Sequence, residues 1–375
     1  MAALHNVIVS GGGTGGHIHP ALAIADEIKR RNPDAQVRFV GALGRMEMEK
    51  VPAAGYDIDG LWISGIDRSL TSTRNLSFPF KLISSLWKAR RLLRKHQPQA
   101  VVGVGGFASG PLLDQAVRKG IPTLIQEQNS FPGITNRLLA QRVQRICAGL
   151  PGLERWFPAD RIVQTGNPLR AHVCALTEAP AERQTEALAH WGLNADAPVV
   201  FVMGGSLGAQ SMNEAVQTIL SKQPRLSERG YQLLWQCGAR YEEACQAWLQ
   251  AHPCDGVVCS GFIDRMDLAY QAADLIASRA GAMSIAELAL VGKPSILVPS
   301  PHVAEDHQTH NARSLTELGG AVLLTDQDVR TKLGGQLNAL LADPDTCATM
   351  GRAMRQAARP DAAAAVVDEL EQLAS

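Results

Sequence analysis

Residues 7–17 read VIVSGGGTGGH, a short apolar run that passes directly into a glycine-rich turn. The same design returns at residues 199–209, where VVFVM is followed by GGSLGA. Glycines after a parallel strand allow a tight turn and a close approach of the backbone to a ligand, and the helix that follows offers unpaired N–H groups to an anion. Two such units predict two α/β domains that face one substrate.

Short β-branched runs alternate with longer amphipathic segments through the rest of the chain. Further strands are predicted at 37–41, 100–104, 122–126, 233–236, 257–260, 275–278, 295–298 and 322–324. This alternation is typical of parallel sheets. Gly166 and Pro168 suit a crossing between domains, which places the boundary near 165–172. A last helix is predicted over 357–373.

The composition is that of an ordinary globular protein. Of 375 residues, 46% are hydrophobic and 19% charged, and 36 basic residues balance 36 acidic ones, so the overall charge does not favour nucleic acid. The first predicted strand starts at Val7, which leaves no room for a secretory signal, and no run reaches the roughly 18 apolar residues of a membrane span. We expect a cytoplasmic protein that at most lies on a membrane.

One interval, residues 70–96, is basic and apolar, with seven Lys or Arg and no Asp or Glu. Such a segment can lie in the headgroup layer of an anionic membrane, or it can pack on the sheet as an amphipathic helix with a solvated basic face. The candidates for membrane contact are Phe78, Phe80, Lys81, Trp87, Lys88 and Arg91.

The first glycine turn satisfies the dinucleotide pattern GxGxxG through Gly11, Gly13 and Gly16. The second strand ends in Gly41-Ala42-Leu43 without the acid that holds a ribose, which disfavours a nicotinamide-dependent dehydrogenase. Neither turn has Lys and Ser/Thr at P-loop spacing, which disfavours an NTPase. His17 follows the turn at the carboxyl edge of the sheet, where it can act as a general base or merely cap the turn.

Two further positions suit a nucleotide diphosphate and its ribose. Ser206 in the second turn and Arg170 at the domain crossing can meet one diphosphate without a metal. Glu287 lies one turn into the helix of a third strand–turn–helix unit, SRAGAMSIAE. Its carboxylate can accept two ribose hydroxyls or complement the helix dipole.

Metal sites are not favoured by the sequence. Its seven cysteines include no C-x-x-C pair. The D-x-D spacings at 57–59 and 326–328 follow no glycine turn, so we interpret them as solvated or strand-edge acids. The polar run at 305–311 places its acids and histidines on adjacent positions, which seldom converge on one ion, and this favours sugar binding.

In this order the motifs resemble those of the MurG family, the bacterial cell-wall N-acetylglucosaminyltransferases. The blocks that carry the resemblance are GGGTGGHIHPALAIA, GVGGFASGP, EQNSFPGITN, TGNPLR, GGSLGAQ, GFIDRM, RAGAMSIAE and DHQTHNA. The family has two Rossmann-like domains with parallel sheets facing a cleft, the GT-B architecture. The resemblance implies an acceptor- and membrane-facing domain at 1–166, a UDP-sugar-binding domain at 167–350, and a C-terminal helix at 351–375 that packs back towards the first domain.

The resemblance also implies a reaction. It is the inverting transfer of N-acetylglucosamine from UDP-N-acetylglucosamine to the C4 hydroxyl of undecaprenyl-pyrophosphoryl-muramyl-pentapeptide, which converts lipid I to lipid II in peptidoglycan synthesis and so serves cell shape and division. No cofactor and no tightly bound metal are implied. His17 matches the family's proposed base, Arg170 and Ser206 the diphosphate contacts, Ile263 the uracil contact and Glu287 the ribose contact. The remaining donor contacts are Thr14, Gly15, Gly16, Asn129, Ala282, Met283, Ser284, Ile285, Ala286 and Gln308.

Because the implied acceptor is anchored in a membrane by a long lipid, the resemblance favours membrane contact for the basic, apolar segment at 70–96. The implied location is the cytoplasmic face of the inner membrane, as a peripheral protein, with the anionic membrane surface and proteins of cell-wall synthesis or division as partners and no nucleic acid. Phe107 departs from the family, which often has Tyr there, and His307 stands where some members carry a second Gln.

Two other functions stay open. A UDP-N-acetylglucosamine 2-epimerase uses a similar two-domain fold, but it would need a further acid and base near the sugar and no lipid-facing patch. A catalytically idle UDP-sugar-binding scaffold at the membrane would need neither His17 nor the complete diphosphate clamp.

Overall fold

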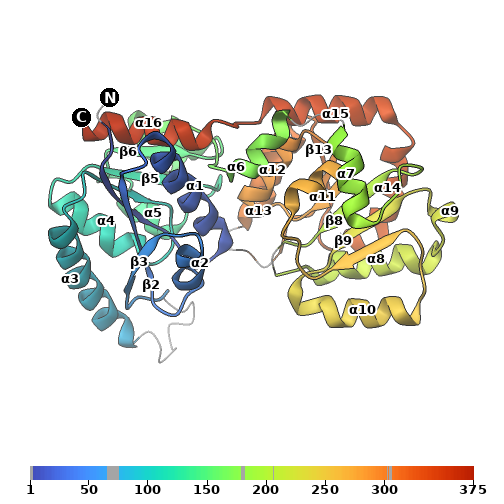
Figure 1. The fold of residues 1–375 in the computed structure, drawn as a ribbon, viewed down its shortest axis with the longest axis horizontal. Helices are drawn as coiled ribbons and strands as arrows, with labels where there is room; N and C mark the ends of the chain where they lie inside the picture. Colours follow the sequence, from blue (N-terminus) through green and yellow to red (C-terminus); the bar gives the residue numbers. More distant parts are fainter. Residues whose placement is uncertain (1–2, 66–75, 179–181, 206, 302, 304–305) are drawn as a thin grey trace. The chain divides into compact units, whose positions relative to one another are not determined.

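The computed structural model describes residues 3–65, 76–178, 182–205, 207–301, 303 and 306–375. Its contacts divide the chain into two compact units (Figure 1). Unit 1 comprises Met1–Arg170 together with Arg359–Ser375, and unit 2 comprises Ala171–Ala358. Each unit is built on one parallel sheet with helices on its faces. This architecture confirms the predicted α/β fold class.

The sheet of unit 1 has seven strands in the order β3-β2-β1-β4-β5-β6-β7. The strands are β1 (Asn6–Ser10), β2 (Gln36–Ala42), β3 (Asp57–Leu61), β4 (Ala100–Gly103), β5 (Thr123–Glu127), β6 (Arg145–Ala148) and β7 (Ile162–Gln164). The order reverses between β1 and β4, which pair from Val7 with Ala100 to Ser10 with Gly103. Open α/β sheets bind ligands outside the carboxyl ends of their strands at such a reversal. The turns that leave β1 and β4 therefore mark the site in this unit.

Helices cover both faces of this sheet, which explains why its central strands are apolar throughout. Val7 and Val9 of β1 belong to one buried cluster with Ile24, whereas Ile8 belongs to a second cluster with Leu112. The helices of unit 1 are α1 (Gly15–Arg31), α2 (Glu47–Ala53), α3 (Phe78–His96), α4 (Ser109–Arg118), α5 (Ile134–Leu139) and α16 (Ala362–Ala374), with short 3-10 turns at Leu153–Arg155 and Ala159–Arg161.

Helix α16 closes one face of unit 1 although it comes last in the sequence. Val366, Val367 and Leu370 are fully buried and join the cluster that contains Val7 and Val9. The apolar face of α16 therefore completes the core beneath β1.

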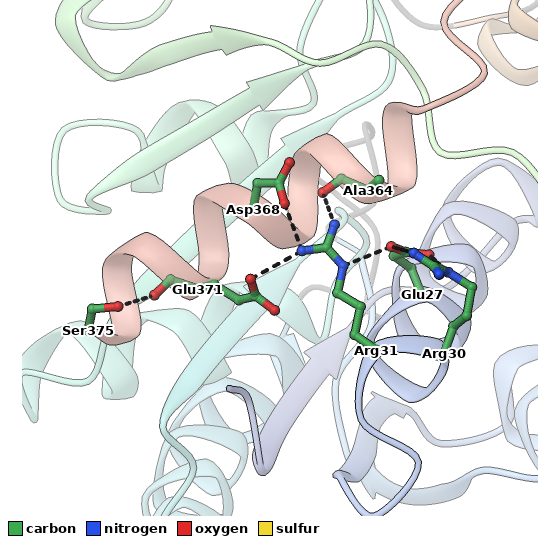
Figure 2. A network of polar contacts seen from close by, with 7 residues as sticks. All are labelled: Glu27, Arg30, Arg31, Ala364, Asp368, Glu371 and Ser375. Atoms are coloured by element: carbon green, nitrogen blue, oxygen red, sulfur yellow. Dashed lines mark hydrogen bonds and ion pairs between the residues drawn. The ribbon is translucent and has the colours of Figure 1, made fainter. Parts of the chain in front are cut away.

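A polar network borders this contact (Figure 2). The guanidinium of Arg31 in α1 donates to Oδ1 of Asp368 at 2.7 Å, to Oε2 of Glu371 at 3.1 Å and to the carbonyl of Ala364 at 3.0 Å. It also donates to Glu27 of its own helix. Although partial burial disfavours the charged guanidinium, its bonds to Glu27 and Asp368 hold the pKa of Arg31 above its usual value. The network fixes the direction in which α16 crosses α1.

The sheet of unit 2 has six strands in the order β10-β9-β8-β11-β12-β13. The strands are β8 (Val199–Met203), β9 (Gln232–Gln236), β10 (Val257–Ser260), β11 (Leu275–Ser278), β12 (Ser295–Leu297) and β13 (Ala321–Leu323). The helices are α6 (Ala171–Cys174), α7 (Glu182–Trp191), α8 (Gln210–Lys222), α9 (Leu226–Arg229), α10 (Glu242–Ala251), α11 (Met266–Ala272), α12 (Ala282–Val291), α13 (His307–Thr316), α14 (Val329–Leu341) and α15 (Pro344–Gln356), with 3-10 turns at Ala175–Glu178 and Ala239–Tyr241. The order reverses between β8 and β11, so the turns after these two strands mark the site in unit 2.

The first observed division falls inside the predicted crossing at 165–172, and the second falls later in the chain than the predicted start of the C-terminal helix. The first division falls at Arg170 rather than at residue 166, because Asn167 hydrogen-bonds to Gln126 and Gln128 of unit 1. The predicted division at residue 351 falls inside α15, which packs on α12 and α14 of unit 2. The chain passes from unit 2 to unit 1 only after Ala358.

Candidate active site

Two glycine-rich turns meet at the carboxyl edge of unit 1. A Cβ atom at Gly11 would lie 2.0 Å from Cγ2 of Val104, and one at Gly106 would lie 2.5 Å from the carbonyl oxygen of Gly12. Gly106 also has a φ of 89°, which side chains rarely tolerate. Only glycine therefore allows the turn after β1 to pack directly against the turn after β4.

His17 lies partly buried in the first turn of α1. Its Nδ1 atom lies 3.0 Å from the carbonyl oxygen of Gly12 and 3.3 Å from Oγ1 of Thr14. A carbonyl oxygen only accepts hydrogen bonds, so Nδ1 carries the proton in this contact and Nε2 of the neutral ring carries the lone pair. A Cβ atom at Gly105 would lie 2.8 Å from Nε2, so this edge of the ring faces the turn after β4. This geometry suits a general base.

The predicted contacts Thr14, Gly15 and Gly16 lie beside His17. Thr14 precedes α1 in an extended conformation, and Gly15 and Gly16 are its first two residues. Thr14 and Gly16 are exposed, and Gly15 is half-buried. Since the first N–H groups of a helix lack acceptors within it, this end of α1 can bind an anion next to His17.

Asn129 is held in place by an acid that the sequence analysis did not single out. Glu127, at the end of β5, is 2% exposed. Its carboxylate accepts from the backbone N–H of Asn129 at 3.0 Å, from that of Gly133 at 3.1 Å and from Nδ2 of Asn136 at 2.8 Å. An acid at the carboxyl end of a predicted strand is the signal that would have revealed it. Glu127 therefore orders the loop that carries Asn129.

Arg170 is the last residue of unit 1 and is half-buried. The segment before it is fixed by Asn167, whose Oδ1 accepts from Gln126 at 3.0 Å and whose Nδ2 donates to the carbonyl of Gln128 at 3.0 Å. The Nε atom of Arg170 is buried and has no hydrogen-bond acceptor among the described residues. A buried donor without an acceptor is costly, so this arrangement suits an external anion. Ser206, predicted to share the diphosphate, lies outside the described residues.

The glycine turn of unit 2 repeats the close packing seen in unit 1. A Cβ atom at Gly208 would lie 2.3 Å from the carbonyl oxygen of Cys237, and one at Gly238 would lie 2.3 Å from Cα of Gly208. Helix α8 begins at Gln210, directly after this turn. The turn after β8 therefore brings a helix N-terminus to the carboxyl edge of the second sheet.

Glu287 lies in the second turn of α12, the helix that follows β11. One carboxylate oxygen, Oε2, accepts from the hydroxyl of Tyr270 in α11 at 2.7 Å. Tyr270 is fully buried, and its ring packs edge-on against Phe201 of β8. Burial and the nearby Glu287 carboxylate raise the pKa of the Cys174 thiol. Glu287 is thus oriented by a rigid tyrosine, which sequence spacing alone did not predict.

Several predicted donor contacts have side chains inside the core. Ala282 and Ile285 of α12 are 8% and 1% exposed, whereas Met283, Ser284 and Ala286 are half-buried. Ile263 is 2% exposed, although its neighbour Phe262 is 53% exposed. Because the side chains of Ala282, Ile285 and Ile263 are buried, the backbone is the part of these residues that is available to a ligand. The predicted run 282–287 did not distinguish the side of α12 that is buried from the side that remains accessible.

Gln308 is the second residue of α13 and is half-buried. Its Oε1 atom accepts from the backbone N–H of Ser300 at 2.9 Å. The bond leaves the side-chain amide N–H₂ to act as the donor group towards a sugar. Nearby, Asn311 of the same helix donates to the carbonyl of Ala280, which ties α13 to the turn after β11.

The D-x-D acids form ion pairs within the protein. Asp57 lies 2.8 Å from Arg38, and Asp326 lies 2.6 Å from Arg279. Hydrogen bonds from Ser211 and Arg279 outweigh burial and lower the pKa of Asp326. Within the described ranges, no three His, Cys, Asp or Glu side chains gather as metal ligands, and the seven cysteines are unbridged thiols.

Helix α3 divides the residues predicted to face a membrane between two flanks. Phe78 is half-buried against the core of unit 1. The ammonium group of Lys81 donates to Oγ of Ser64 at 3.0 Å, and that of Lys88 donates to the carbonyl of Gly60 at 2.6 Å. These three side chains therefore lie on the flank of α3 that contacts unit 1, and they remain partly exposed there.

The other face of α3 exposes a stripe of large apolar side chains. Leu76, which lies two residues before the start of α3, and Phe80, Ile83 and Trp87 of the helix itself are between 66% and 75% exposed. The three helical residues are spaced by three or four positions, which places them on one side of α3. The guanidinium of Arg91, also exposed, lies 5.9 Å from the centre of the Trp87 ring. We call Leu76, Phe80, Ile83 and Trp87 the α3 stripe. In the part of the chain that the structure describes, no helix combines the length and hydrophobicity needed to cross a bilayer.

Two parallel-sheet α/β units, each with glycine turns at the carboxyl edge, have the architecture of the GT-B fold, and the family models identify a glycosyltransferase. The N-terminal domain of glycosyltransferase family 28 matches residues 7–148, and its C-terminal domain matches residues 199–366. The crystal structure of MurG from Acinetobacter baumannii has a TM-score of 0.77 at 30% identity and covers 98% of this chain and 99% of that one.

A similar protein of Christiangramia forsetii is named UDP-N-acetylglucosamine–N-acetylmuramyl-(pentapeptide) pyrophosphoryl-undecaprenol N-acetylglucosamine transferase. It is 48% identical over 98% of this chain and 97% of its own length. The chain therefore belongs to the MurG family. A UDP-GlcNAc 2-epimerase from Neisseria meningitidis has a TM-score of 0.66 at 13% identity, which shows a shared fold alone.

Proposed function

We propose that this protein transfers N-acetylglucosamine from UDP-N-acetylglucosamine to the C4 hydroxyl of lipid-linked N-acetylmuramyl-pentapeptide. Membership of the MurG family over nearly the whole chain carries this proposal. It is supported by the orientation of His17, whose Nδ1–H is directed to Gly12. An idle scaffold would not require a base that is oriented in this way.

In the proposed reaction His17 is the general base. Its Nε2 takes the proton of the acceptor's C4 hydroxyl as that oxygen attacks the anomeric carbon of the donor sugar. The bond from the anomeric carbon to the UDP oxygen breaks in the same displacement, which inverts the configuration and gives a β-1,4 linkage. UDP leaves with the electron pair of that bond.

The charge that develops on UDP needs preorganised partners. Arg170, whose buried Nε has no acceptor within the part of the chain that the structure describes, offers an N–H donor, and the helix N-terminus after Gly208 offers a positive dipole end. We assign Ser206 to the same diphosphate on the resemblance alone. No metal is required in this scheme, because a cationic side chain and helix dipoles stabilise the leaving group.

The ribose is assigned to Glu287, which Tyr270 holds from the core side at 2.7 Å. Tyr270→Phe is expected to raise the KM for UDP-N-acetylglucosamine by about 3- to 10-fold with little change in kcat, because the loss of one hydrogen bond costs roughly 1 kcal/mol. Initial rates at varied donor concentration test this. Tyr231→Phe is the matched control, since Tyr231 is buried in the same unit and its hydroxyl has no partner among the described residues. Equal effects of the two variants would contradict the assignment.

The α3 stripe is proposed to dock unit 1 on the anionic cytoplasmic face of the inner membrane. Its apolar side chains are flanked by Arg91 and further basic residues of the last turns of α3. This combination suits the headgroup layer, where cations attract anionic lipid and aromatic side chains insert. A long lipid on the acceptor makes such a position useful.

The double substitution Phe80→Ser with Trp87→Ser is expected to lower binding to phosphatidylglycerol vesicles by about tenfold or more, because each large apolar side chain contributes roughly 1.5–3 kcal/mol when buried. Co-sedimentation measures the binding. Activity should fall on vesicle-embedded acceptor and persist on a short-chain soluble acceptor. Leu318→Ser, an exposed leucine of unit 2, is the control. Equal losses on both acceptors would indicate a packing role instead.

The proposed function is tested by release of UDP from UDP-N-acetylglucosamine with and without the lipid-linked muramyl-pentapeptide. Acceptor-dependent release with a disaccharide product supports the transferase. Interconversion of the sugar without acceptor would support the epimerase, and binding of UDP-sugar without turnover would support the scaffold.

A further inference from the structure

Glu47 is a buried acid that neither the resemblance nor the proposed reaction uses. It is the first residue of α2 and only 1% exposed. Its Oε1 accepts from the backbone N–H of Ala42 at the end of β2 at 2.9 Å, and its Oε2 accepts from the backbone N–H of Gly13 at 2.8 Å. Both carboxylate oxygens therefore bind backbone, one of them in the first glycine turn.

Two glycines make the space that this carboxylate occupies. A Cβ atom at Gly12 would lie 2.2 Å from Cδ of Glu47, and one at Gly41 would lie 2.6 Å from its Cγ. Neither glycine has a positive φ, so their conformation alone does not call for glycine. Part of the glycine-rich pattern thus serves to admit a protein carboxylate rather than a ligand.

The contact continues through one peptide group to His17. The peptide between Gly12 and Gly13 donates its N–H to Glu47 at 2.8 Å, and the carbonyl of the same peptide lies 3.0 Å from Nδ1 of His17. A carboxylate that accepts the N–H polarises the peptide and makes its carbonyl a stronger acceptor, since hydrogen bonds in a chain reinforce one another.

We propose that Glu47 is a positioning residue that acts on His17 through the Gly12–Gly13 peptide. The inference rests on the proposed role of His17 as the base. The chain of contacts holds the proton on Nδ1 and the lone pair on Nε2, and it supports the positive charge that the ring gains when Nε2 takes the acceptor's proton. An acid bonded directly to a base histidine does the same in other enzymes. Here one peptide group separates the two.

Glutamate fits this role better than glutamine would. Two N–H groups face the side chain, and a carboxylate accepts from both, whereas an amide has one acceptor oxygen and turns its own N–H₂ towards one of the two donors. Glu47→Gln keeps the shape of the side chain, removes its charge and breaks one of the two bonds.

Glu47→Gln is expected to lower kcat by roughly 10- to 100-fold, the effect that loss of an outer orienting partner has at metal-bound histidines. The KM for UDP-N-acetylglucosamine should stay within about threefold. Glu49→Gln is the matched control, because Glu49 lies two residues further along α2 and is exposed. In a His17→Ala background, Glu47→Gln should change kcat by less than about twofold, since the residue has no base left to position. Multiplicative losses in the double variant would overturn the proposal in favour of a purely structural role.

A second measurement needs no substitution of Glu47. Nitrogen-15 NMR of the histidine-labelled wild-type protein at high pH, assigned by comparison with His17→Ala, should show His17 as the Nδ1–H tautomer. An Nε2–H tautomer would overturn the proposal even if Glu47→Gln failed to fold. Failure of the proposed function is distinguished from both results, because the wild-type protein would then show no acceptor-dependent release of UDP, whatever the tautomer of His17.

Discussion

His17→Ala is expected to lower kcat by about 10²- to 10⁴-fold, which is the usual contribution of a general base. The donor contacts proposed in unit 2 do not involve this side chain, so the KM for UDP-N-acetylglucosamine should remain within a few-fold of the wild-type value. UDP release under saturating lipid-linked acceptor gives kcat, and calorimetric titration with UDP tests whether donor binding is intact.

His17→Asn separates the base from the hydrogen bond. Asparagine places an amide N–H near the position of Nδ1 and can still donate to the Gly12 carbonyl, but it has no basic nitrogen to take a proton. The same severe loss is expected for this variant. If either substitution kept more than about a tenth of the wild-type kcat, another group would have to be the base, and the role of the turn after β1 would be limited to binding.

The central strands were predictable from sequence because both of their faces are buried. Val199–Met203 is an unbroken apolar run, Leu275–Ser278 is apolar up to its last residue, and the predicted limits agree with the observed ones to within a residue. Strands β3, β6 and β7 were missed. β3 reads DIDGL at the edge of the sheet, where Asp57 and Asp59 pair with Arg38 of β2 in place of an apolar alternation. Polar edge strands carry too weak a pattern to be recognised alone.

The candidate site could be located from sequence, but its internal contacts could not. A strand followed by glycines and a helix places His17 at a sheet edge whatever the rest of the chain does. The hydrogen bond that Gly13 donates to Glu47 joins residues 34 positions apart, and the one that Tyr270 donates to Glu287 joins residues 17 positions apart. Both bonds depend on how the helices pack. A local sequence pattern does not predict a contact between residues so far apart in the sequence.

Side-chain direction was the other limit of the sequence analysis. Lys88 is as basic as Arg91, yet its ammonium group turns inward to the carbonyl of Gly60 while Arg91 remains exposed beside Trp87. The two differ by three positions on one helix, and only the packing of α3 on the sheet shows which flank meets the core. The same holds for Ile263, whose side chain is buried beside an exposed phenylalanine.

Leu370→Ala is expected to lower the free energy of unfolding of unit 1 by about 2–5 kcal/mol, the usual cost of truncating a fully buried leucine. Leu370 is 0% exposed and shares a cluster with Val7 and Val9 of β1. Hydrogen exchange resolved by peptide measures the effect within each unit. Peptides of β1, β4 and α1 should exchange faster, whereas those of β8 and β11 should be unchanged. Gln372→Ala, on the exposed side of α16, is the control.

Uniformly faster exchange in both units would contradict the assignment of α16 to unit 1. The expected pattern has a consequence for catalysis, because β1 ends in the turn that holds Gly12, Gly13 and His17. A looser packing of α16 beneath β1 should therefore lower kcat as well as stability, although α16 itself offers no group to the reaction. Helix α16 would then affect His17 by packing beneath β1, and not by contact with the substrate.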